Sequence, residues 1–122
     1  MHSPYEVPHV TVSDARLSDV DADLIVIPVA QDQTAAAAAR YESPLGDDLR
    51  SAIERGEFRG QAHETLVARP PAAWRAARVV FVGSGPRADV TPERIRRMAV
   101  AAAHVARQQK RARIAWADVE PG

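Results

Sequence analysis

The 122-residue sequence contains no cysteine. This absence excludes disulfide bonds, thiolate metal ligands and thiol catalysis, and it fits the cytoplasm. The sequence also lacks an apolar run approaching the ~18 residues of a membrane-spanning helix. Its first residues show no basic segment followed by an apolar core, the pattern of an export signal. We therefore expect a soluble, cytoplasmic protein with no membrane partner.

Net charge is also absent, because 16 basic residues balance 16 acidic ones. The two signs are segregated along the chain. Residues 1–48 hold nine acids and two bases, a net charge of −7, and residues 49–122 hold fourteen bases and seven acids, a net charge of +7. Such asymmetry can favour self-association or an acidic partner. The interpretation we favour is that folding interleaves the two halves into a surface of mixed charge.

The sequence shows no metal-binding or nucleophile motif. Its four histidines, His2, His9, His63 and His104, are far apart, and none lies three or four residues from another. Ser84 lies between two glycines but outside a Gly-x-Ser-x-Gly elbow, so a turn explains it better than a nucleophile does. We predict no catalytic residue and no metal ligand in this chain.

Two continuous apolar runs indicate strands buried on both faces. Residues 78–83 form the first and are closed by glycines, which predicts a central strand. Residues 22–30 form the second, and because Pro28 lacks an N–H we expect that strand to end or bulge there. Residues 65–68 and 114–117 predict two further strands, and the alternation in residues 7–12 predicts an edge strand with one wet face.

Helical spacing appears on both sides of residues 78–83. Residues 45–53 repeat apolar side chains every three to four positions, with Asp47 and Asp48 in the first turn, where carboxylates suit the helix dipole. A longer helix is predicted after Thr91, which can cap it, with Pro92 at its first position. The apolar positions of this helix are Ile95, Met98, Ala99, Ala102, Val105 and Ala106. The alanine run 35–39 indicates one or two surface turns.

These elements predict a single domain over residues 1–122 with an α/β fold. A strand that is buried on both faces needs a layer of helices above and below the sheet. The expected architecture is therefore a three-layer α/β/α sandwich.

The loop after the predicted central strand is a candidate ligand-binding site. Its backbone N–H groups and the Arg87 side chain could hold a phosphate, as glycine-rich loops before helices do. Pro86 removes one donor, however, and the next helix begins several residues later, so a tight crossover is the more economical interpretation. The candidate cofactor-binding residues are Gly83, Ser84, Gly85 and Arg87.

The polar side of the last helix is a candidate nucleic-acid or subunit interface. Basic side chains recur there at helical spacing, with only Glu93 as a nearby acid, and could contact phosphates in a salt-dependent way. Against nucleic acid, the chain has only six aromatic residues and none between Phe81 and Trp116 to stack bases. The residues of this basic face are Arg96, Arg97, Arg107, Lys110 and Arg111.

Four segments in order resemble the N-terminal domain of the leucyl (cytosol) aminopeptidases. They are residues 23–27, residues 56–60 followed by Glu64, residues 78–85, and the helix start at 91–96. The resemblance covers almost the whole chain and implies a macro-domain-like fold with a mixed sheet. The sequence departs from the family at Gln61, His63 and Pro86-Arg87, where lysine, glycine and lysine respectively are common.

The resembled family consists of cytoplasmic, hexameric aminopeptidases that use two divalent metals, manganese or zinc. The metal ligands and catalytic residues of these enzymes belong to a C-terminal domain, which we expect to be absent from this chain. The resemblance therefore implies a non-catalytic module that contributes to assembly and shapes access to the active site, with no cofactor of its own. Its partners would be the catalytic domain and other subunits, and some relatives also bind DNA.

Two alternatives remain open. Macro-like folds elsewhere bind ADP-ribose, and Asp21 or Asp23 could accept a hydrogen bond from an adenine amino group. The sequence has no asparagine, however, and residues 28–31 stand where ribose-binding macro domains commonly carry one. The other alternative is an accessory DNA-contacting domain that uses the basic face.

Overall fold

The computed structural model describes residues 9–13 as backbone, and residues 17–109 and 113–117 with their side chains. The strands of the described chain are β1 (His9–Ser13), β2 (Leu24–Val29), β3 (Thr65–Ala68), β4 (Arg78–Gly83) and β5 (Arg113–Ala117). Its helices are α1 (Thr34–Arg40), α2 (Leu45–Glu54) and α3 (Pro92–Gln108), with 3₁₀ turns η1 (Leu17–Asp19), η2 (Gln31–Gln33) and η3 (Arg87–Asp89). No helix in this part of the chain is long and apolar enough to cross a membrane.

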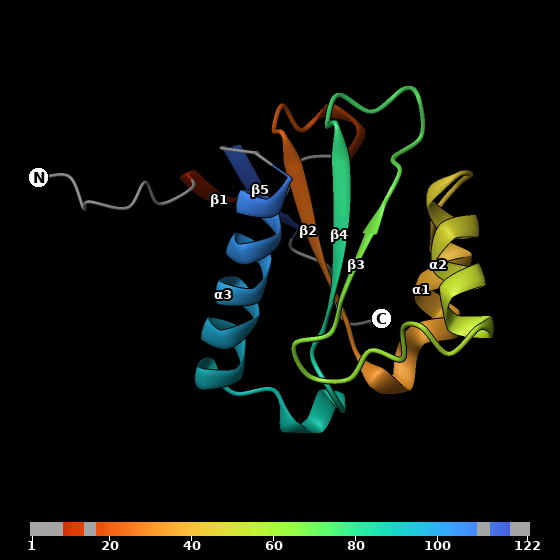
Figure 1. The fold of residues 1–122 in the computed structure, drawn as a ribbon, viewed down its shortest axis with the longest axis vertical. Helices are drawn as coiled ribbons and strands as arrows, with labels where there is room; N and C mark the ends of the chain where they lie inside the picture. The colour runs from red at the N-terminus through yellow and green to blue at the C-terminus, as the bar shows by residue number, and fades with distance from the viewer. Residues whose placement is uncertain (1–8, 14–16, 110–112, 118–122) are drawn as a thin grey trace, which may run out of the picture.

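The described strands form one mixed sheet in the order β1-β5-β2-β4-β3. β3 pairs antiparallel with β4, and the other pairs are parallel. Helices α1 and α2 lie on one side of the sheet and α3 on the other (Figure 1). The predicted α/β sandwich is confirmed, as is the edge position of the first strand. β4 is an inner strand as expected, although β2 occupies the middle of the sheet.

Alternate residues of β4 enter two separate cores, which explains its unbroken apolar sequence. Val79 and Phe81 pack on the α1–α2 side together with Leu49 and Phe58, all buried. Val80 and Val82 pack on the α3 side. Their partners there are Leu24, Val26, Ile114, Met98, Ala102, Val105 and Ala106.

Helix α3 begins as predicted, because the Thr91 hydroxyl accepts a hydrogen bond from the Arg94 amide at 3.1 Å and Pro92 is the first helical residue. Its predicted apolar face is only partly buried. Ile95 is 48% exposed and Ala99 is exposed. Ile95 borders an open cavity at the end of the sheet, so no other side chain covers it fully.

Strand β2 continues through Pro28, contrary to the expected end or bulge. Pro28 pairs with Val82 in an unbroken parallel register with β4. The Val29 carbonyl accepts from the Ser84 amide at 3.0 Å, so Val29 faces β4, and Pro28 therefore faces the other side. On that side the described residues of β5 pair with β2 as far as Val26. The missing N–H of Pro28 consequently interrupts none of the described ladder pairs.

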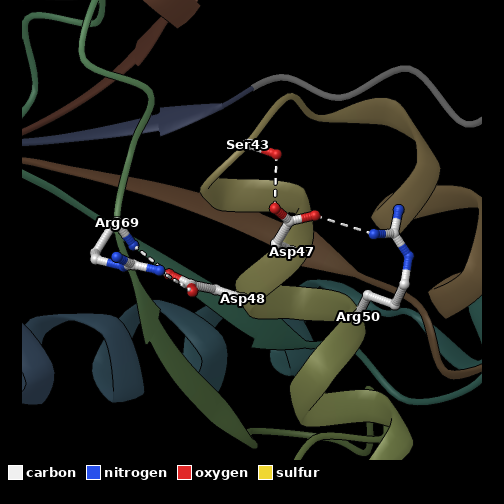
Figure 2. A network of polar contacts seen from close by, with 5 residues as sticks. All are labelled: Ser43, Asp47, Asp48, Arg50 and Arg69. Carbon is white, nitrogen blue, oxygen red and sulfur yellow. Dashed lines mark hydrogen bonds and ion pairs between the residues drawn. The ribbon is translucent and has the colours of Figure 1, made fainter.

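Hydrogen bonds to Asp48, in the first turn of α2, connect this helix to the end of β3. Its carboxylate accepts hydrogen bonds from the Arg69 amide at 3.0 Å, from Nε at 3.1 Å and from Nη2 at 2.8 Å (Figure 2). These hydrogen bonds hold the pKa of Asp48 below its usual value. Neighbouring Asp47 instead bonds Ser43 and Arg50, and the Asp47–Arg50 pair is exposed on both sides.

We expect Asp48→Asn to lower the free energy of unfolding at neutral pH by roughly 1–2 kcal/mol, the range for a partly screened charged hydrogen-bond pair. Because the folded pKa of Asp48 lies below the unfolded value of about 3.9, its stabilising effect is complete above about pH 5. The effect is lost as the pH falls through 4 and below. Urea unfolding of both proteins across this pH range measures the difference.

The matched control is Asp47→Asn, which removes a carboxylate from the same helical turn but from an exposed pair. It should cost less than about 0.5 kcal/mol. Equal losses in the two variants, or an Asp48→Asn loss that persists unchanged in acid, would contradict the assigned role of the Asp48–Arg69 pair.

Candidate functional site

A cavity of about 410 Å³ lies at the carboxyl ends of β2 and β4. Its walls come from the end of β2, the inner side of α1, the loop after β4, the start of α3, and Trp116 of β5. The loops that follow β2 and β4 leave the sheet toward opposite faces, the first toward α1 and the second toward α3 (Figure 1). Parallel sheets commonly bind ligands at such a point.

The loops after β2 and β4 are tied to each other beside this cavity. The Gln31 amide donates to the Gly85 carbonyl at 2.9 Å, and the Arg87 amide donates to Asp32 Oδ1 at 3.3 Å. Tyr41 on the α1 side packs against Phe81 with ring centroids 5.8 Å apart, and burial raises the pKa of its phenol. These contacts give the cavity walls fixed positions.

The polar side chains that line the cavity are Gln33, Arg40, Tyr41, Ser84 and Arg87, and no carboxylate of the described residues lines it. Arg40 and Arg87 form no ion pair with any carboxylate in the described part of the chain. The remaining lining is apolar, so the cavity combines an apolar interior with two positive charges.

The backbone amides of the glycine loop are occupied by the fold itself. The Gly83 amide donates to the Glu64 carbonyl at 2.7 Å, the Ser84 amide to Val29, and the Gly85 amide to the Gly60 carbonyl at 2.9 Å. Pro86 has no N–H. Of the four predicted cofactor-binding residues, only Ser84 and Arg87 line the cavity. Any ligand there would meet side chains and not a cradle of free N–H groups.

Gly83 is needed for close packing against another backbone segment, and Gly85 for its left-handed conformation, with φ of +72°. A Cβ on Gly83 would lie 2.0 Å from the Gln61 carbonyl oxygen and 2.6 Å from the Gly60 carbonyl carbon. A Cβ on Gly85 would lie 2.5 Å from Arg94 Nη1, which donates to the Ser84 carbonyl at 2.7 Å. The glycine motif therefore lets the loop at 60–61 cross directly over the end of β4.

Glu64 and His63 shape that crossing loop. Glu64 Oε1 accepts from the Arg59 amide at 2.7 Å and from the Gln61 amide at 3.2 Å. His63 has φ of +70°, a left-handed conformation that disfavours residues with a Cβ, and its Nε2 is buried without a hydrogen-bond partner among the described residues. This is the position where the resembled family commonly has glycine.

Asp21 and Asp23 lie before β2, at the opposite end of that strand from the cavity. Asp21 accepts from Arg113 Nη2 at 2.9 Å, which lowers its pKa, and Asp23 Oδ2 accepts from the Arg113 amide at 2.9 Å. Their pairing with Arg113 does not favour the interpretation of these carboxylates as adenine acceptors, which stays a prediction. They join the start of β2 to β5.

The basic face of α3 is partly neutralised. Arg96 and Arg97 both pair with Glu93, at 3.3 Å and 3.1 Å. Arg107 is exposed, whereas Lys110 and Arg111 lie outside the described residues.

The sequence analysis missed Arg94, whose side chain donates a hydrogen bond to the Ser84 carbonyl. The signal that could have identified it is its position four residues before buried Met98, which places it on the sheet-facing side of α3.

In the part of the chain that the structure describes, no three histidine or acidic side chains converge as metal ligands would.

Comparison with known proteins gives one family. The profile of the cytosol aminopeptidase family, N-terminal domain, matches residues 26–120. No curated protein sequence matches the chain. The structure is similar to the macrodomain of Mycobacterium tuberculosis DarG, with a TM-score of 0.68 and 16% identity over 94% of this chain and 79% of that one. It is also similar to a mutant tomato leucine aminopeptidase, with a TM-score of 0.63 and 17% identity over 100% of this chain and 25% of that one.

The left-handed conformation of His63 gives a prediction. We expect His63→Gly to raise the free energy of unfolding by about 0.5–1 kcal/mol, because relief of backbone strain exceeds the entropy cost of glycine. His63→Ala is the matched control, since it removes the imidazole but keeps the Cβ. Thermal unfolding of the three proteins compares them, and an equal gain in both variants would refute the strain explanation.

Proposed function

Because the chain belongs to the cytosol aminopeptidase family, whose N-terminal domain it represents, we propose that it is the non-catalytic N-terminal domain of a leucyl aminopeptidase-type metallopeptidase. The single observation that carries this proposal is the family match over residues 26–120, most of the chain. The parent enzyme would remove N-terminal amino acids from peptides in the cytoplasm, and its catalytic domain would hold two manganese or zinc ions.

The side chains of the described residues support a non-catalytic role. The hydroxyl of Ser84, the serine at the end of β4, is buried and donates to the Gly85 carbonyl at 3.3 Å. No histidine of the described residues lines the cavity to act as its base. The described lining of this cavity therefore pairs Ser84 with no histidine base.

An assembly role has support from the outer side of α3. Val100 is 62% exposed there, and Ala99 beside it is exposed as well. Apolar side chains next to Arg96 and Arg107 suit contact with the catalytic domain or with another subunit of a hexamer. Contact of this kind would let the domain shape access to the active site.

The two alternative functions rank lower. A nucleotide-binding role is favoured by the cavity but opposed by the engagement of Asp21 and Asp23 at the far end of β2. A DNA-contacting role depends on a face whose Arg96 and Arg97 already pair with Glu93. Any phosphate contact from this face would be weak and sensitive to salt.

The purified chain should not hydrolyse leucine p-nitroanilide in the presence of manganese or zinc. The measurement is release of p-nitroaniline, compared with a metal-only control, across every fraction of a gel-filtration peak. Turnover that follows the protein peak and survives a second purification would overturn the non-catalytic assignment. Release that stays at the control level in all fractions supports it.

A further inference from the structure

We propose that the cavity at the carboxyl ends of β2 and β4 is a binding site for a small organic anion with a flat apolar body, whose acidic group pairs with Arg40 and Arg87. This inference goes beyond the accessory role and does not depend on it. A cavity of about 410 Å³ is within the usual size range for small-molecule sites, and one with an apolar lining and a few polar groups is the usual composition.

The charge of the ligand follows from the lining. Arg40 and Arg87 both border the cavity, and among the described residues its lining contains no carboxylate to balance them. Neither arginine pairs with an acid elsewhere in the described chain. Guanidinium groups bind carboxylates and phosphates through paired, charge-assisted hydrogen bonds. The amides of the glycine loop are already bonded, so these arginines are the cavity's positively charged anchors.

The small residues that line the cavity leave room for the body of the ligand and so limit its shape. Ala36 and Ala37, within the alanine run of α1, line the cavity and leave the space that larger side chains would fill. The other walls are mainly apolar, including Pro28, Ile95 and Trp116. A flat apolar body suits such walls, because burying apolar surface stabilises the complex by roughly 25 cal/mol per Å².

Pro28 suits the β5-facing edge of β2 beside this cavity. Among the described residues β5 pairs with β2 as far as Val26, whereas β2 and β4 pair as far as Val29 and Gly83. Pro28 has no N–H, so an opening beside it leaves no backbone donor of this residue unpaired.

The test uses 1-anilinonaphthalene-8-sulfonate, which joins a flat aromatic body to a sulfonate. Its fluorescence should rise with the folded protein and saturate. Ala36→Trp should weaken binding at least about tenfold by filling the cavity, because Ala36 is exposed and the change leaves the core intact. The matched control is Ala39→Trp, on the same helix and also exposed but outside the cavity lining.

A second pair of variants tests the charges. Arg40→Gln and Arg87→Gln should each weaken binding about five- to tenfold, whereas Arg107→Gln, an exposed arginine away from the cavity, should not. Circular dichroism and thermal unfolding establish that each variant is folded. Equal binding by Ala36→Trp and Ala39→Trp, or by the cavity arginine variants and Arg107→Gln, overturns the proposal.

Competition separates the sources of the anion. Displacement of the dye by AMP or ADP-ribose, but not by adenosine, assigns the site to phosphate-bearing ligands. Displacement by 3-phenylpropionate, but not by its neutral amide, assigns it to carboxylates. If neutral adenosine or the amide competes as well as its charged counterpart, or if no anion competes, the site is not an organic-anion site.

Discussion

At the end of β4 two backbone segments approach each other so closely that the neighbouring loops take their positions from this contact. The carbonyl of Gln61 passes so near to Gly83 that a Cβ there would lie 2.0 Å from its oxygen. This contact lets Gly83 bond with Glu64 and His63, which starts the antiparallel pairing of β3. It also lets Gly85 bond with both Gly60 and Gln31, which positions the loops after β2 and β4. The walls of the cavity follow from these positions.

The same contact explains why the segments that carry the family resemblance are spread over the sequence but meet in the structure. The glycine loop at 56–60, Glu64 and the glycines after β4 form one junction. Glu64 closes the loop with its carboxylate, and the glycines allow the loop to cross the sheet. These residues have a structural role, because the backbone amides that could have bound a phosphate already donate hydrogen bonds inside the junction. A glycine-rich sequence after a strand indicates that another group approaches the backbone closely there. Whether that group is a ligand or another loop depends on residues elsewhere in the chain.

The sequence was sufficient to predict the layers, the inner strands and the start of α3. These features depend on local patterns: apolar runs of strand length, the Thr91-Pro92 helix start, and the spacing of Met98, Ala102 and Val105. It was not sufficient for Pro28 or for Ile95. The effect of Pro28 depends on which neighbouring strand it faces, and the exposure of Ile95 depends on the cavity that it borders. The first is set by strand register, and the second by segments distant in the sequence.

The cavity is the clearest example of a feature that local sequence patterns do not predict. Ser84 and Arg87 could be proposed from sequence because they follow a buried strand, but Arg40 and Ala36 come from an alanine-rich segment that local patterns identify only as a surface helix. What makes these residues neighbours is the hydrogen bond between Gln31 and Gly85, which joins the loops after β2 and β4. The alanines of α1 add little to an apolar helix face, but their small side chains leave space at the end of the sheet. The alanine run therefore has a function in the fold that helix propensity alone does not explain: it leaves a wall of small methyl groups beside two arginines that form no ion pair with a described carboxylate.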